Sequence, residues 1–92
     1  MIVGFRHKGL KRLFEEDDGS GVRPDLRGKV RTILAQLNEA QTIEDMRMTS
    51  FHLHPLKGDM KGLWSVTVRA NWRIVFRFVN GDADGVDLID YR

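Results

Sequence analysis

The second half of the chain carries polar side chains of the types that act on phosphate esters. They comprise histidines, several cations, a carboxylate and a phenol, and the candidates are His52, His54, Lys57, Lys61, Arg69, Arg73, Arg77, Asp90 and Tyr91. This set suits cleavage of RNA without a metal, in which the 2'-OH of one nucleotide attacks the neighbouring phosphate. That reaction needs a base near the 2'-OH, cations against the extra negative charge of the transition state, and a donor for the leaving 5'-oxygen.

Three of these residues can transfer protons. Histidine changes its protonation near neutral pH, so His54 can serve as the base or the acid. Asp90 can orient His54 or act as the base itself, and Tyr91 can donate a proton or stack on a base of the RNA. The residue types alone leave the assignment of acid and base open.

The cations are expected to bind the phosphates. Lys57, Arg69 and Arg73 are predicted to stabilise the scissile phosphate, since an arginine can bind two of its oxygens at once. Lys61 and Arg77 are expected to add general positive charge for RNA binding.

Each residue also has an interpretation without chemistry. Arginines on the open side of an antiparallel sheet are usually solvated, and a histidine next to a strand-ending proline is often simply exposed. Trp64 and Trp72 fit packing at the core or its rim better than stacking on RNA bases. From the residues alone, the prediction is a small domain with a basic face that suits nucleic acid.

Other kinds of site find little support in the sequence. The absence of cysteine excludes disulfides and thiolate chemistry. His52 and His54 are the only close pair of histidines and no carboxylate cluster accompanies them, so we expect neither a metal nor another cofactor.

Two helices are predicted before residue 40. Residues 7–17 place Leu10, Leu13 and Phe14 at helical spacing. A longer helix should begin near Pro24, whose fixed φ suits a first helical position. Its apolar stripe consists of Leu26, Val30, Ile33, Leu34 and Leu37.

The pattern changes from helical to alternating after residue 50. Residues 51–54 are predicted as a strand that Pro55 ends or confines to an edge. Residues 64–69 and 72–79 predict a hairpin, residues 86–91 a last antiparallel strand, and residues 1–5 an edge strand or an extended lead-in. The expected fold is α+β, with two helices on one face of a small antiparallel sheet whose other face is polar and basic.

The register of the hairpin decides which residues share the polar face. A two-residue turn at Ala70 and Asn71 would set Arg69 opposite Trp72 and would mix polar with apolar side chains. We therefore favour a three-residue loop, which sets Arg69 opposite Arg73. Two facing arginines repel each other, so this register predicts an anion between them.

Size and composition predict one small domain that spans residues 1–92, because 41% of the residues are hydrophobic and 30% are charged. No apolar run approaches the roughly 18 residues that cross a bilayer, and the N-terminus lacks the cleavage site of a secretory signal. We expect a cytoplasmic protein without membrane contact. The net charge of +2 conceals a basic stretch at 51–78, which can attract a polyanion.

Three segments resemble one known family. The opening FRHKGLKRLFEE, the central LHPLKGDMKGLWSVTVRANWRIVFRF and the closing DLIDYR are similar to the HigB toxins of bacterial toxin-antitoxin systems, within the wider RelE and ParE superfamily. The resemblance covers nearly the whole chain, and it implies a RelE-like fold.

The resemblance also implies a function. Members of the family are ribosome-dependent mRNA endonucleases that enter the A site, cleave the bound codon, and are neutralised by a helix-turn-helix antitoxin called HigA. Operator DNA would be contacted only through the toxin-antitoxin complex. The matching functional positions are His54, Lys57, Arg69, Arg73, Asp90 and Tyr91.

One departure from the family concerns the C-terminus. Members end in Asp-Tyr-His, whereas this chain ends in Asp90, Tyr91 and Arg92. If that histidine is a proton donor in the family, Tyr91 or His54 takes the acid role here, and Arg92 can hold a phosphate.

Two alternatives belong to other functional classes. One is a non-catalytic gyrase poison of the ParE type, against which Arg69, Arg73 and His54 argue together. The other is an inactive domain that only binds an antitoxin or represses its own operon.

Overall fold

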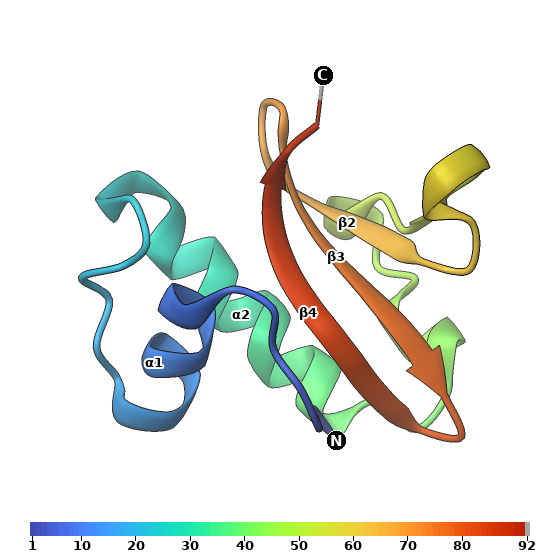
Figure 1. Cartoon of the computed structure of the whole chain (residues 1–92), viewed down its shortest axis with the longest axis horizontal. Coiled ribbons are helices and arrows are strands. Elements are labelled where there is room, and N and C mark those ends of the chain that lie inside the picture. The colour runs from blue at the N-terminus through green and yellow to red at the C-terminus, as the bar shows by residue number, and fades with distance from the viewer. Residues whose placement is uncertain (92) are drawn as a thin grey trace.

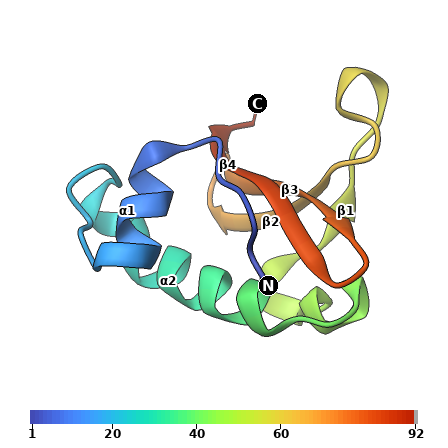
Figure 2. The same cartoon turned by 60° about the horizontal axis from the view of Figure 1, so that its bottom comes forward.

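The computed structural model describes residues 1–91, and Arg92 lies outside this range. Helices and strands follow one another as shown in Figure 1. The elements are α1 (Lys8–Glu16), α2 (Pro24–Glu39), η1 (Ile43–Met46), η2 (Thr49–Phe51), β1 (His54–Pro55), η3 (Gly58–Met60), β2 (Trp64–Arg69), β3 (Trp72–Val79) and β4 (Asp82–Asp90), where η denotes a short 3-10 helix. The antiparallel strands are ordered β1-β2-β3-β4, and α2 runs beneath the sheet in Figure 2. The α+β prediction is confirmed.

The apolar stripe of α2 lies at the centre of the core. Its five predicted residues are at most 1% exposed, and they belong to one cluster with the inward side chains Val66, Ile74 and Phe76 of the sheet. Burial on this scale contributes most of the stability of such a small domain. In α1, Leu10 and Leu13 join the same cluster.

The starts of the two helices have local causes. Helix α1 begins at Lys8 because the Leu10 N–H donates to Nδ1 of His7, at 3.1 Å, which caps the first turn. Helix α2 begins at Pro24, as predicted. Its Gly28 does not serve close packing, since a Cβ added there would meet no atom within 4 Å.

The N-terminal segment extends the sheet beyond β4. Ile2 bridges Ala83 and Phe5 bridges Val86, both in parallel orientation. The Val3 N–H donates to the Ala83 carbonyl at 2.8 Å. The predicted extended lead-in is confirmed, and it adds a parallel pairing to an otherwise antiparallel sheet.

The connection from α2 to β1 is shaped by a capping turn at η1. The carboxylate of Asp45 accepts from the N–H groups of Gln41 and Thr42, at 2.9 and 3.1 Å. These two hydrogen bonds lower the pKa of Asp45 below its ordinary value. Together with the Thr42 side chain, Asp45 forms a capping box here.

The predicted strand at 51–54 is wrong for most of its length. Residues Thr49–Phe51 form η2, and His52 has a left-handed φ of 48°, so extended structure is limited to His54 and Pro55 in β1. The alternation of Phe51 and Leu53 arises instead because both side chains pack toward the core around this turn. Pro55 does lie in an edge strand, as predicted.

The predicted register of the β2–β3 hairpin is also wrong. Arg69 pairs with Trp72 across a two-residue turn, and a bulge then shifts the pairing so that Thr67 lies opposite Arg73. The bulge absorbs one residue at Val68, which keeps Val66 opposite Ile74 in the core. Arg69 and Arg73 therefore do not face each other.

We predict that Gly28→Ala stabilises the protein by about 1 kcal/mol, because alanine lowers the entropic cost of the helix and its Cβ has open space. Urea denaturation measures the free energy of unfolding. Gly9→Ala is the matched control in the other helix, where the new Cβ would lie 2.5 Å from the Gly21 carbonyl oxygen and should destabilise the fold. Equal effects of the two substitutions would contradict this packing.

The register can be tested by disulfide trapping, which is clean because the natural chain has no cysteine. Directly opposite residues of antiparallel strands are close enough for a disulfide. We expect the Thr67→Cys/Arg73→Cys pair to cross-link on mild oxidation and the Arg69→Cys/Arg73→Cys pair to remain reduced, as measured by free-thiol titration. The reverse result would restore the register favoured from the sequence.

Candidate active site

The face of the sheet away from the helices carries several of the candidate residues. Alternation along each strand directs Ser65 and Thr67 of β2, and Arg73, Val75 and Arg77 of β3, to the side opposite the core residues. We call this surface the open face.

Two cross-strand rows organise the open face. One row joins Thr67, Arg73 and Ile89. The next row joins His54, Ser65, Val75 and Asp87. His54 and Arg73 therefore lie two strands apart, about 10 Å across the strands and about 7 Å along them, with Thr67 and the buried Ser65 between them. An extended phosphate backbone can bridge such a separation.

His54 and Lys57 lie together at the β1 edge. His54 is exposed, and Lys57 is exposed at the position that precedes η3. Both are reachable by a ligand on the open face.

Arg73 is half-buried, and its guanidinium is held by backbone oxygens. It donates to the Ala70 carbonyl at 2.6 Å and to the Trp72 carbonyl at 3.2 Å. Within residues 1–91 it forms no ion pair with a carboxylate. The hairpin tip thus positions this cation, and no carboxylate of the described residues pairs with it, which suits it to bind an anion.

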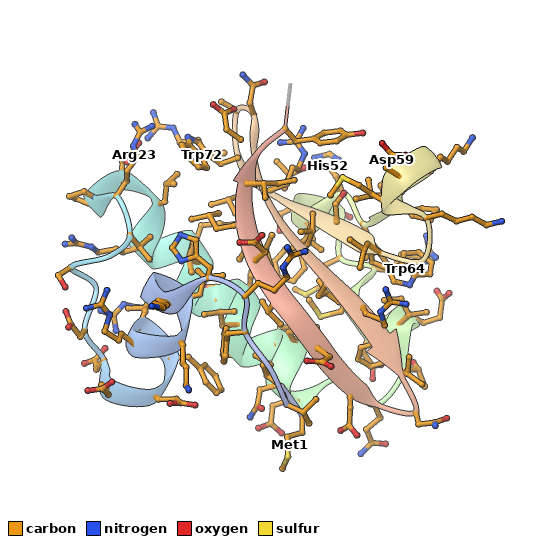
Figure 3. The ribbon with its side chains drawn as sticks, viewed as in Figure 1. Met1, Arg23, His52, Asp59, Trp64 and Trp72 are labelled. Atoms are coloured by element: carbon orange, nitrogen blue, oxygen red, sulfur yellow. The ribbon has the colours of Figure 1, made fainter. Side chains whose placement is uncertain are left out.

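Arg69 lies in a different environment. Its Nη1 is 3.5 Å from Oδ2 of Asp25 in the first turn of α2. Arg69 pairs across the hairpin with Trp72, whose side chain packs against the core. The Arg23 guanidinium lies 5.7 Å from the centroid of the Trp72 ring, and the two side chains are labelled in Figure 3. The bulge has turned Arg69 toward the helices, so the predicted anion site between Arg69 and Arg73 is not formed.

Asp90 and Tyr91 follow β4 to the same end of the sheet as the hairpin tip. Asp90 pairs with Trp72, and the Tyr91 N–H donates to the Asn71 carbonyl at 2.8 Å. Tyr91 is 46% exposed. Asp90 shares its row with Trp72 and therefore lies on the helix side of the sheet, whereas Arg73 lies on the open face. Strand β4 is three strands from β1, so the structure does not bring Asp90 and Tyr91 directly beside His54 and Lys57. Arg92, the remaining candidate, lies outside the described residues.

Lys61 and Arg77 border a hollow on the other half of the open face. Its volume is about 280 Å³, and its lining also includes Arg6, Asp84 and Asp87, which the sequence prediction did not single out. An isolated glycine inside a strand signals a bulge, so Gly85 could have drawn attention to this region.

Residues 1–91 contain neither a cluster of metal ligands nor a membrane-spanning helix. No three His, Asp or Glu side chains gather there closely enough to hold a metal ion. No helix in that part of the chain is long and apolar enough to cross a membrane.

Comparison with known proteins gives a consistent result. Residues 3–92 match the family described as the RelE-like toxin of the type II toxin-antitoxin system HigB. The chain is 47% identical to Endoribonuclease HigB of Proteus vulgaris over 99% of both chains. It is 28% identical to Toxin HigB-1 of Vibrio cholerae serotype O1 over 90% of both chains. The chain therefore belongs to the HigB family of RelE-like toxins of type II toxin-antitoxin systems.

Proposed function

We propose that this protein is an endoribonuclease that cleaves mRNA in the A site of the ribosome. The observation that carries the proposal is the position of Arg73 on the open face, where its guanidinium is held by backbone carbonyls and no carboxylate of residues 1–91 pairs with it, with His54 two strands away. The relative from Proteus vulgaris, whose name is Endoribonuclease HigB, supports the same activity.

The chemistry assigned to the site is attack of the RNA's own 2'-OH on the adjacent phosphate. The new bond joins the 2'-oxygen to phosphorus, and the bond from phosphorus to the 5'-oxygen breaks. The products are a 2',3'-cyclic phosphate and a free 5'-OH. No metal or other cofactor takes part in this proposal.

Charge and proton transfer are divided among the residues of the open face and its rim. Arg73 and Lys57 stabilise the negative charge that develops on the phosphate. His54 or Asp90 removes the proton from the 2'-OH, and Tyr91 or His54 protonates the leaving oxygen. Tyr91 also offers an exposed ring on which a base can stack.

Arg69 receives a different role from the one expected. Because Asp25 partly neutralises it, we assign it to the RNA backbone at the hairpin rim rather than to the scissile phosphate. Lys61 and Arg77 add RNA contacts further along the open face, and the same role is proposed for Arg92.

The partners follow from the family. A type II toxin-antitoxin system implies an antitoxin partner. We propose a HigA-like helix-turn-helix antitoxin, with operator DNA bound only through the complex. We propose that the protein acts in the cytoplasm, where translated messages are found, and that residues 1–92 act as one domain.

The proposal predicts that Arg73→Ala reduces mRNA cleavage by about 100-fold or more, the usual cost of removing one group that stabilises a transition-state charge. Primer extension on a translated message after brief induction measures the cuts. The matched control is Arg69→Ala on the same hairpin, which should retain activity within about tenfold because an exposed, partly neutralised arginine contributes little.

Three outcomes would count against this account. Growth arrest with intact messages and a DNA-damage response would favour a gyrase poison. Unchanged toxicity of Arg73→Ala would favour a domain that only binds its antitoxin. A larger loss for Arg69→Ala than for Arg73→Ala would reverse the roles of the two arginines.

A further inference from the structure

The hollow on the open face lies next to the proposed catalytic row. Its floor includes Val75, which is two residues from Arg73 on β3 and therefore about 7 Å further along the strand. Val75 also shares a cross-strand row with His54. A nucleotide neighbouring a phosphate held by Arg73 can reach this position.

The lining combines an apolar floor with groups of both charges. Met60, Leu63 and Val75 supply the apolar part. The cations are Arg6, Lys61 and Arg77, and the acids are Asp59, Asp84 and Asp87. Opposite charges in equal number leave the hollow without a net charge, which disfavours a bare phosphate as its occupant and suits a heterocycle with both donors and acceptors.

The walls come from distant parts of the chain. Asp59 lies on η3, which is found beside β2 in Figure 3, on the side of the sheet that is away from β4. Gly85, which has a positive φ, lines one side. Gly62, which also has a positive φ, lies beside the Arg77 guanidinium, since a Cβ added there would be 3.6 Å from its Nη1. The bulge at Gly85 shifts the pairing so that Arg77 lies opposite Asp84.

The polar groups of the hollow keep bonding capacity for a ligand. One oxygen of Asp84 accepts from the Gly85 N–H at 2.8 Å, and one oxygen of Asp87 accepts from the Leu88 N–H at 2.9 Å. Each carboxylate thus retains its second oxygen. Among residues 1–91, Arg77 has neither a hydrogen-bond partner nor an ion-pair partner for its side chain.

We propose that this hollow binds the base of the nucleotide adjacent to the scissile phosphate and selects bases with an exocyclic amino group. Carboxylate oxygens accept from the amino groups of cytosine, adenine and guanine, whereas uracil presents a carbonyl at the corresponding position. Arg77 donates to the ring carbonyl of cytosine or guanine, or to the nucleotide's phosphate. The assignment to a flanking nucleotide rests on the proposed endonuclease function, but binding of the base does not.

The direct test is a nuclear magnetic resonance titration of the whole protein, labelled with nitrogen-15, with CMP and separately with UMP. We expect the amide signals of Gly62 and Gly85 to shift, with roughly tenfold tighter binding of CMP because a hydrogen bond to a charged group is lost with UMP. The Asp84→Asn/Asp87→Asn double variant should abolish this difference, since each asparagine keeps the oxygen that accepts from the backbone. Asp82→Asn, on the same strand and outside the hollow, should preserve it.

Several results would overturn the proposal. The first is equal affinity for the two nucleotides, and the second is a change of amide signals only around His54. The third is that neither nucleotide shifts the amide signals of Gly62 and Gly85, while the antitoxin shifts both. None of these depends on RNA cleavage. Conversely, a wild-type protein that leaves messages uncut but discriminates CMP from UMP would refute the endonuclease function alone.

A second arm uses the cuts themselves. Mapping of cleaved ends should show that the Asp84→Asn/Asp87→Asn variant raises the share of cuts flanked by uracil by about threefold or more, because a carboxamide can also donate to a carbonyl. The same share of uracil as in the Asp82→Asn control would contradict the proposal.

Discussion

Burial of the apolar stripe of α2 against one side of the sheet decides which side chains remain accessible. Val66, Ile74 and Phe76 are fully buried by this contact, so alternation leaves Thr67, Arg73 and Arg77 on the opposite side. The basic surface is thus a consequence of core packing. A shift of β3 by one residue in its pairing register would expose the apolar side chains and bury the arginines. The free-energy cost of that exchange would be prohibitive.

Two bulges refine this arrangement. The first, at Val68, directs Arg69 toward Asp25 and leaves Arg73 on the open face. The second, at Gly85, sets Arg77 opposite Asp84 and shapes the hollow. Because of these two bulges, Arg69 pairs with Asp25 of α2, whereas Arg73 and Arg77 lie on the open face, where RNA is proposed to bind.

Periodicity was sufficient to predict the elements that depend on local pattern. The stripe of α2, its start at Pro24 and the alternation of β2 and β3 all follow from neighbouring residues. The prediction failed where distant contacts decide the outcome. The alternation of apolar and polar residues from Phe51 to His54 is also typical of a strand. In the folded chain Phe51 instead ends η2, and His52 has a left-handed φ. The partner of Arg69 lies on a helix far away in the chain, and no spacing in the hairpin reveals it. The hollow draws on the N-terminal segment, η3, β3 and β4, so it required the folded structure.

The central claim is that the open face supports attack by the RNA's own 2'-OH, with Arg73 against the phosphate. The most direct measurement is cleavage of a ribosome-bound message in which the nucleotide on the 5' side of a mapped cut carries a 2'-deoxyribose. The account predicts that this cut disappears while other cuts persist, and that the unmodified message yields a 2',3'-cyclic phosphate end. Cleavage of the deoxy-substituted position at an unchanged rate would contradict the account, because the nucleophile would then have to come from elsewhere.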